Sequence, residues 1–322
     1  MKNPPFEVTL NILSLSNQIQ EILGEFKTNL HSKPSVKLRK QNKIKTVHHS
    51  LAIEGNSLTE EQVTALMENK RVAGPKKQII EVQNALALYD KINSLNPLKE
   101  SDLLKAHGIL MKDLISTPGK YRHSNVGIIK AGSVSHVAPQ AKMVPELMKN
   151  IFHFLKKNHE VPLLIKACIF HYELEFIHPF EDGNGRIGRL WQQSILMKHS
   201  PILEYVSIET LIHKRQKEYY KVLEACDRSG KSTLFIEFSL ELILESMLLL
   251  QKEYRPKKIS GSDRIAAALE SLGDGFSRKD YLELYREIST ATASRDLAEA
   301  VENRFLKRVG EKSQAVYKKL KS

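Results

Sequence analysis

A short polar run between two helical stretches constrains this 322-residue chain more than any other part of it. Residues 162–177 carry apolar side chains at helical spacing, and Pro179 then prevents the helix from continuing. Residues 186–198 again present one apolar helical face, so the sequence predicts a loop that begins at His178 and ends at a second helix N-terminus. Free N–H groups and the positive end of the helix dipole meet there, which favours an anion.

Glycines and arginines at this point suit phosphate groups. Gly183 and Gly185 can adopt positive φ and let the backbone approach a ligand closely. Arg186 and Arg189 are three residues apart and share a helix face, from which they would clamp successive phosphates.

The same loop carries a carboxylate and an imidazole. Asp182 is placed for magnesium, because Mg²⁺ is commonly held by one or two carboxylates together with substrate phosphate oxygens. An unperturbed histidine is largely neutral at pH 7, so His178 can take a proton from an attacking hydroxyl. Each residue alone also fits a structural role, as a helix stop, a turn or a solvated face.

Residues 178–189 match the signature H-x-F-x-[D/E]-G-N-G-R-x-x-R at every specified position, and the chain resembles the Fic family. The resemblance implies a mainly α fold: a helical bundle with a β-hairpin flap. Because members mostly transfer AMP from ATP to a protein side-chain hydroxyl, it implies a protein adenylyltransferase that uses ATP and Mg²⁺. It assigns a base (His178), a magnesium ligand (Asp182), an anion-binding turn (Gly183, Asn184, Gly185) and polyphosphate contacts (Arg186, Arg189).

The related Doc branch phosphorylates its target with the nucleotide reversed. It carries lysine where this chain has Gly185, so the resemblance favours AMP transfer over phosphate transfer.

Residues 104–111 and 118–122 look like the family's lead-in to its flap. Residues 126–129 and 134–137 are β-prone and predict a hairpin, whose flap residues are Val126, Gly127, Ile128 and Val137. An exposed hairpin edge can add an extended target peptide as another strand. The alternative is a small hairpin that only covers a helical domain.

A second motif lies upstream, where Ser50 and Glu54 are one helical turn apart and Gly55 suits a helix C-cap. It fits the family's inhibitory motif, [S/T]-x-x-x-E-[G/N]. The resemblance implies that Glu54 pairs with Arg189 and blocks the γ-phosphate, so that the enzyme is restrained in cis.

Composition breaks predict three regions: N-terminal helices with the inhibitory motif (1–95), the catalytic domain (96–253) and a C-terminal domain (257–322). In the catalytic domain, Tyr219 and Tyr220 resemble a family pair near the adenine, although tyrosines at helical positions are more often packing residues. Residues 208–227 and 234–252 are expected to form two further helices.

Residues 263–322 predict a small α+β winged helix, with three helices and a β-wing at 305–309 and 314–317. Residues 289–295 would open the recognition helix. Residues 257–322 hold 14 basic and 10 acidic side chains, and Glu299 and Glu302 lie on that same helix. DNA binding and docking of a protein, or of a second copy of the chain, therefore both stay open.

The formal net charge of +12 raises the question of nucleic-acid binding for the whole chain. The sequence contains no apolar run long enough for a membrane span and no signal peptide's apolar centre, so a cytoplasmic protein is expected. Cys168 and Cys226 lack metal or redox spacing and read as core thiols.

The sequence leaves two functions open. The first is an adenylyltransferase that modifies a protein, itself included, and can form a homodimer; the second is a DNA-binding transcriptional regulator whose Fic domain senses nucleotide. The histidine favours the enzyme, since a sensor needs no base.

Overall fold

The computed structural model describes residues 3–28, 36–130, 133–253, 260–273, 275–285, 288–310 and 315–320. The chain divides into two compact units, Met1–Tyr254 and Arg255–Ser322. The N-terminal helices and the loop at residue 178 thus belong to one unit, and a domain boundary near residue 95 stays a prediction.

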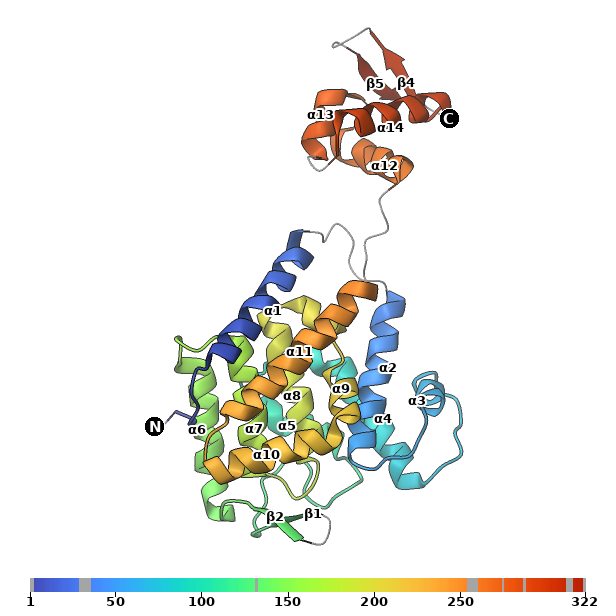
Figure 1. Ribbon diagram of the computed structural model, residues 1–322. Coiled ribbons are helices and arrows are strands. Elements are labelled where there is room, and N and C mark those ends of the chain that lie inside the picture. Colours follow the sequence, from blue (N-terminus) through green and yellow to red (C-terminus); the bar gives the residue numbers. More distant parts are fainter. Residues whose placement is uncertain are drawn as a thin grey trace. The chain divides into compact units, whose positions relative to one another are not determined.

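The first unit is a helical bundle with one small hairpin (Figure 1). Its helices are α1 (Leu10–Thr28), α2 (Val36–Ile53), α3 (Glu60–Met67), α4 (Lys76–Lys91), α5 (Glu100–Leu110), α6 (Val144–Lys157), α7 (Leu163–Ile177), α8 (Asn184–His199), α9 (Ile208–Lys214), α10 (Gln216–Ser229) and α11 (Thr233–Glu253), with short 3-10 turns η1 (Ile92–Ser94), η2 (Ala141–Met143) and η3 (Pro201–Tyr205).

Helices α7 and α8 pack against each other at the centre of this unit (Figure 1). Both are buried around most of their circumference: in α7 only Leu163, Glu173, Glu175 and Phe176 escape full burial. Trp191 of α8 is fully buried, and its indole N–H donates to the Pro97 carbonyl at 3.0 Å. The polar loop between α7 and α8 is therefore carried by two closely packed, largely buried helices.

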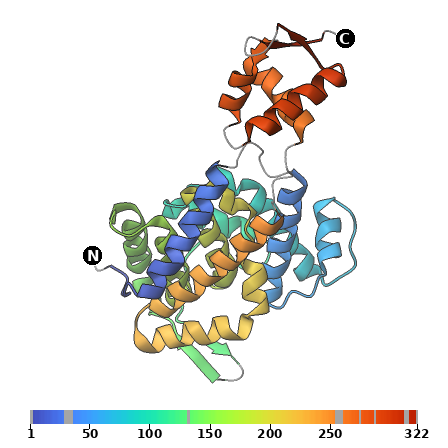
Figure 2. The same ribbon diagram turned by 45° about the horizontal axis from the view of Figure 1, so that its top comes forward.

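The N-terminal segment is fixed to the last helix of the unit. Helix α1 runs beside α11 (Figure 2). The Glu7 N–H donates to Thr233 Oγ1 at 2.9 Å, and Thr9 Oγ1 donates to Glu237 Oε1 at 2.5 Å. Gln251 donates to Glu25 near the far ends of both helices, so the two helices run parallel.

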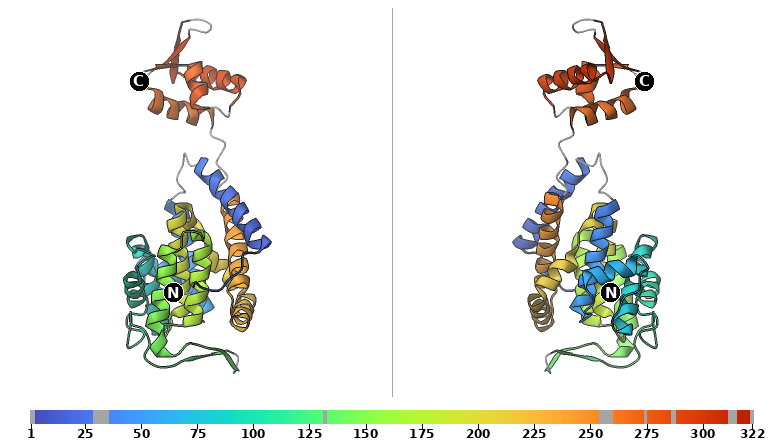
Figure 3. Two further views of the ribbon diagram at one scale, coloured as in Figure 1. Left: turned by 90° about the vertical axis from the view of Figure 1, so that its left-hand side faces the viewer. Right: turned by 90° about the vertical axis from the view of Figure 1, so that its right-hand side faces the viewer.

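A two-stranded antiparallel sheet, β1 (Gly127–Lys130) and β2 (Ser133–Val137), extends from one end of the helices (Figure 3). Gly127 pairs with Val137 and Ile128 with His136, and the register then shifts at a bulge between Ile128 and Ile129. The expected turn at Ala131 and Gly132 lies outside the described residues.

The second unit has its own core and a three-stranded antiparallel sheet of order β3-β5-β4. Asp296 anchors this core, because its carboxylate, 6% exposed, accepts from Arg264 at 2.8 and 2.9 Å and from the Tyr281 hydroxyl at 3.0 Å. The elements are α12 (Gly261–Leu272), β3 (Gly275–Ser277), α13 (Arg278–Leu284), α14 (Thr290–Glu302), β4 (Leu306–Val309) and β5 (Val316–Lys319).

The expected fold class is confirmed as mainly helical, with a small antiparallel sheet near the C-terminus. The single helix expected over residues 208–227 is wrong, because α9 ends at Lys214 and α10 begins at Gln216. No glycine or proline marks that break. Long-range contacts explain it: the Gln216 amide donates to the Ile53 carbonyl at 2.8 Å, while Arg215 reaches Glu241 of α11 at 3.4 Å.

Two elements were not anticipated. Helix α6 buries Val144, Met148, Ile151 and Leu155 at helical spacing, a signal that the sequence does contain. Strand β3 has only three residues, too few for an alternation of apolar and polar side chains to be recognised in the sequence.

Among the described residues, no helix combines the length and the apolar character that crossing a membrane would require. Cys168 and Cys226 are both buried, and burial raises the pKa of the Cys168 thiol to about 12.

Candidate functional site

The loop begins with a left-handed residue. His178 caps α7 with φ 47° and ψ 60°, and its N–H donates to the Leu174 carbonyl at 2.9 Å. Such a conformation is uncommon outside glycine, although histidine adopts it more often than most residues, and the surroundings must hold it in place. The chain reverses here and begins α8 six residues later.

Buried contacts fix the middle of the loop. The Phe180 N–H donates to Asn184 Oδ1, and Asn184 Nδ2 donates back to the Phe180 carbonyl, both at 2.9 Å. Phe180 is fully buried and stacks on the His107 ring with centroids 3.7 Å apart. The Asn184 side chain is thus committed to the loop, which leaves its backbone N–H as the group able to meet an anion.

His107 holds the outer part of the loop. Its Nδ1 accepts from the Gly119 N–H at 2.9 Å, so the Nε2–H donates to the Asp182 carbonyl at 2.9 Å. Burial lowers the pKa of His107 to about 4, so the ring stays neutral at pH 7 and keeps this donor and acceptor pattern. His107 lies in the run 104–111 that resembles the family's lead-in to its flap, but no local pattern indicates this role.

The two turn glycines have different reasons to lack a side chain. Gly183 precedes α8 with φ 85°, and a Cβ there would lie 2.6 Å from Met111 Sδ. A Cβ on Gly185 would lie 2.4 Å from Glu54 Oε1 and 3.1 Å from Arg189 Nη1. Gly185 therefore clears the space in which a carboxylate now meets Arg189 at the α8 N-terminus.

Arg186 lies between two carboxylates. Its Nη2 donates to Asp182 Oδ1 at 2.8 Å, and its Nη1 donates to Glu81 Oε1 at 3.2 Å. The other Glu81 oxygen accepts from Asn56 Nδ2 at 2.8 Å, which links Arg186 to the segment after Glu54. Glu81, on α4, was not anticipated.

The Asp182 carboxylate is ionised and accessible. Partial burial opposes its ionisation, but the Arg186 guanidinium and the Gly183 N–H outweigh that effect, and the pKa of Asp182 is lowered. Its side chain is 45% exposed, whereas that of Arg186 is 6% exposed. Asp182 is consequently a carboxylate beside the glycine turn that a hard cation can reach.

Arg189 is bound by the upstream motif. Its side chain is 1% exposed, and it donates to Ser50 Oγ at 3.1 Å, to the Ser50 carbonyl at 2.8 Å and to Glu54 Oε1 at 2.8 Å. Burial disfavours the guanidinium charge, yet the charge of Glu54 outweighs it and the pKa of Arg189 is raised. The structure therefore joins the two motifs, 135 residues apart in sequence, in one ion pair.

A buried polar cluster lies close enough to Arg189 for Tyr219 and Glu175 to interact with its charge. Tyr219 is 1% exposed, and its hydroxyl contacts His171 Nε2 at 3.2 Å and Glu175 Oε1 at 3.4 Å. His171 Nδ1 in turn contacts Gln192 Oε1 at 2.7 Å. Tyr219 is thus a core residue, whereas Tyr220 is only half buried, and contact of this pair with adenine stays a prediction.

The hairpin residues lie as expected along the sequence, with Gly127 and Ile128 in β1, Val137 in β2 and half-buried Val126 just before β1. Their backbone pairing is described above, and the side chains of residues 127–137 lie outside the description. The structure thus brings together His178, Asp182, the glycine turn, both arginines and Glu54, and leaves Tyr219 in the core.

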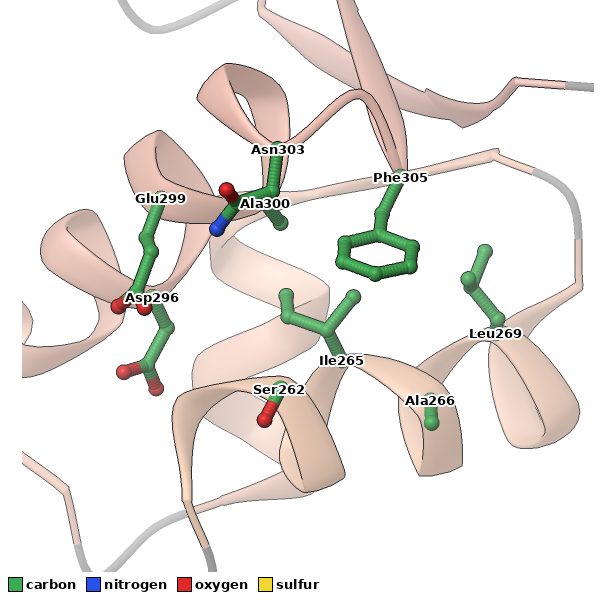
Figure 4. A pocket seen from close by; sticks show the side chains of 9 residues that line it. All are labelled: Ser262, Ile265, Ala266, Leu269, Asp296, Glu299, Ala300, Asn303 and Phe305. Atoms are coloured by element: carbon green, nitrogen blue, oxygen red, sulfur yellow. The ribbon is translucent and has the colours of Figure 1, made fainter.

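A hollow of about 130 Å³ lies in the C-terminal unit. Figure 4 shows Phe305, just before β4, facing it together with Ile265 and Leu269 of α12. None of the residues expected at the nucleotide site lines this hollow. It is lined by Ser262, Ile265, Ala266, Leu269, Asp296, Glu299, Ala300, Asn303 and Phe305.

Together, the fold and the loop define a helical protein with an anion-binding turn, a histidine and two arginines at one helix N-terminus. The Fic/DOC family model matches residues 97–196. A Fic family protein from Desulfovibrio desulfuricans G20 is 36% identical, with a TM-score of 0.74 over 100% of this chain and 99% of that one. The chain belongs to the Fic/DOC family.

Other relatives support the same fold. A Fic domain containing signaling protein from Bacteroides thetaiotaomicron is 22% identical, with a TM-score of 0.62 over 78% of this chain and 98% of that one. The protein adenylyltransferase Fic of Nematostella vectensis is 30% identical over 207 residues, which is 58% of this chain and 46% of that protein. That of Drosophila melanogaster is 27% identical over 217 residues, 62% and 40% of the two chains. The chain spans less than half the length of these curated relatives.

Proposed function

We propose that the chain is a protein adenylyltransferase, which transfers AMP from ATP to a Ser, Thr or Tyr hydroxyl of a protein target, itself included, and that Glu54 restrains it in cis. The observation that carries the proposal is the meeting of His178, exposed Asp182 and two arginines at the α8 N-terminus. The names of the curated relatives support the same reaction.

In the proposed reaction, the target hydroxyl oxygen forms a bond to the α-phosphorus of ATP. The bond from that phosphorus to the oxygen bridging the α- and β-phosphates breaks, and pyrophosphate leaves with the electron pair. His178 takes the hydroxyl proton. Arg186, Arg189 and the first N–H groups of α8 would hold the phosphate charges, and donors fixed in advance contribute most when they need not reorganise.

Asp182 would hold Mg²⁺, and it fits this role because it is an accessible, ionised carboxylate beside the phosphate-binding turn. When bound, the ion would neutralise phosphate charge. If the Asp182 carboxylate turned from Arg186 to a bound cation, Glu81 would be the remaining described partner of Arg186.

We expect Asp182→Asn to raise the Mg²⁺ concentration needed for nucleotide binding by ~10- to 100-fold, since a charged ligand is removed. Titration of Mg²⁺ at fixed ATP measures this. The control is Glu181→Gln, because Glu181 is exposed and accepts only from Ser116 and Thr117 among described residues. An unchanged Mg²⁺ requirement in Asp182→Asn would remove Asp182 as the ligand.

The proposed restraint follows from the Arg189 contacts. Glu54 and a γ-phosphate are competing anions for one guanidinium, and Gly185 provides the space in which Glu54 reaches it. ATP that cannot engage Arg189 does not keep its phosphates in line for attack.

The reaction is tested by incubating the Glu54→Gly protein with cell extract, labelled ATP and Mg²⁺, followed by mass analysis of labelled proteins. A mass increment of one adenylyl group supports the proposal. A phosphoryl increment would instead indicate the Doc type of reaction, despite Gly185.

A second candidate function concerns the C-terminal unit, which we propose is a winged helix that contacts DNA phosphates through its strands. Residues 260–303 hold five basic and nine acidic side chains, whereas residues 304–322 hold seven basic and one acidic. Lys307 pairs directly with Lys318 across β4 and β5, and like charges placed opposite each other are destabilising unless an anion joins them. Helix α14 carries exposed Glu299 and Glu302, which disfavour a purely helix-led contact.

We expect the double variant Lys307→Ala/Lys318→Ala to weaken duplex binding and to reduce the slope of log affinity against log salt by about 2, one for each phosphate that the lysines no longer neutralise. Electrophoretic shifts at several salt concentrations measure this. Arg295→Ala, on α14, is the comparison and should change the slope less. Salt-independent binding, or a larger effect of Arg295→Ala, would contradict contact through the strands.

A further inference from the structure

Arg122 is a buried guanidinium whose partners are carbonyl groups. It is 4% exposed, and within the described residues every hydrogen bond of its side chain ends on a backbone oxygen. Burial lowers its pKa, yet an arginine stays charged at neutral pH. A buried cation whose N–H groups all donate to backbone carbonyls fixes the path of that backbone.

On one side, Arg122 closes the end of α7. Its Nε donates to the His178 carbonyl at 2.7 Å, and its Nη2 reaches the Ile177 carbonyl at 3.3 Å. These carbonyls belong to the last turn of a helix, where acceptors lack helical partners and the dipole favours a cation. The Arg122 N–H also donates to the Pro179 carbonyl at 2.9 Å.

His178 depends on these contacts because its backbone is left-handed. Its own N–H is fixed by Leu174, and its carbonyl by Arg122. Both sides of the strained residue are therefore held, one by α7 itself and one by a side chain 56 residues upstream.

On its other side, the same guanidinium holds both ends of the flap. Nη1 donates to the Ser124 carbonyl at 2.8 Å, before β1, and Nη2 donates to the Pro139 carbonyl at 2.5 Å, after β2. The Ala141 N–H adds a second closure by donating to Asn125 Oδ1 at 2.8 Å. One side chain thus joins the base of the hairpin to the residue that starts the loop.

We propose that Arg122 is a positioning residue that makes His178 and the base of the flap one rigid unit. A hydroxyl presented along the hairpin edge then meets the imidazole at a fixed geometry. This inference rests on the proposed function. Arg122 contacts neither Asp182 nor the two arginines of the loop in the described structure, so it acts on the reacting hydroxyl and base and leaves the phosphate contacts alone.

The test uses Arg122→Lys and Arg122→Gln in the full chain carrying Glu54→Gly. Lysine keeps the charge but cannot reach four carbonyls as a planar fork, and glutamine keeps one donor group without charge. We expect nucleotide affinity with Mg²⁺ to stay within about threefold, while AMP transfer falls on the order of 100-fold, the effect of displacing a catalytic group by about 1 Å. Arg228→Gln is the control, because Arg228 is 71% exposed on α10.

Hydrogen exchange gives a readout that does not depend on activity. In both Arg122 variants, amides of residues 124–126, 137–141 and 177–180 should exchange faster, while those of α8 stay unchanged. If the Glu54→Gly parent shows no transfer, the proposed function fails, and the exchange pattern still decides the role of Arg122. Unchanged exchange in all three segments, or loss of nucleotide binding in step with transfer in a folded variant, would overturn the inference. If the glutamine variant does not fold, the lysine variant decides.

Discussion

Glu54→Gly should raise AMP transfer and self-labelling on the order of 10- to 100-fold. Glu54 accepts a charge-assisted hydrogen bond from a side chain that is 1% exposed, and such bonds contribute about 1.5–3 kcal/mol. Without the competing anion, Arg189 can interact with the γ-phosphate at no such cost. A free-energy difference of that size corresponds to a rate increase on the order of 10- to 100-fold. Incorporation of labelled AMP, measured together with ATP affinity, tests the expectation.

The control is Glu61→Gln, because Glu61 is exposed on α3 and leaves Arg189 untouched. A smaller change, Glu54→Gln, should release part of the effect, since the amide keeps the shape of the side chain but loses its charge. Unchanged incorporation in Glu54→Gly, with ATP binding intact, would discard the restraining role.

His178→Ala, made in the Glu54→Gly protein, should lower AMP transfer by ~10²- to 10⁴-fold, the usual contribution of a general base. ATP binding should remain, because the phosphate contacts come from α8 and its arginines. Single-turnover labelling and nucleotide binding, measured on the same preparation, separate the two effects.

His159→Ala is the matched control, because His159 is exposed and lies beyond the end of α6. Full transfer by His178→Ala would contradict its assignment as the base. Loss of labelling in Glu54→Gly itself, together with specific DNA binding, would favour the regulator that senses nucleotide.

The loop at residue 178 was predictable because its signals are local. Pro179 ends one helix, Gly183 and Gly185 begin the next, and the spacing of Arg186 and Arg189 follows from helical geometry. Ser50 and Glu54 were recognised from a motif of six positions, and the family resemblance named the pairing partner before the fold was known.

The supporting residues could not be found in this way, because their partners are distant in sequence. Glu81 meets Arg186 across 105 residues, and His107 meets the loop across 75. Nothing in either residue's neighbourhood indicates those partners. The break at Arg215 is of the same kind, since the contacts of Gln216 with α2 and of Arg215 with α11 override a continuous helical pattern.

The pairing of Glu54 with Arg189 joins two side chains of one covalent chain. Its strength is therefore set by an effective local concentration and is independent of how much protein is present. Diluting the protein, or adding a partner that binds at another surface, would leave that pairing unchanged. Only a movement of the last turn of α2, or a ligand able to displace a tethered anion, can expose the guanidinium.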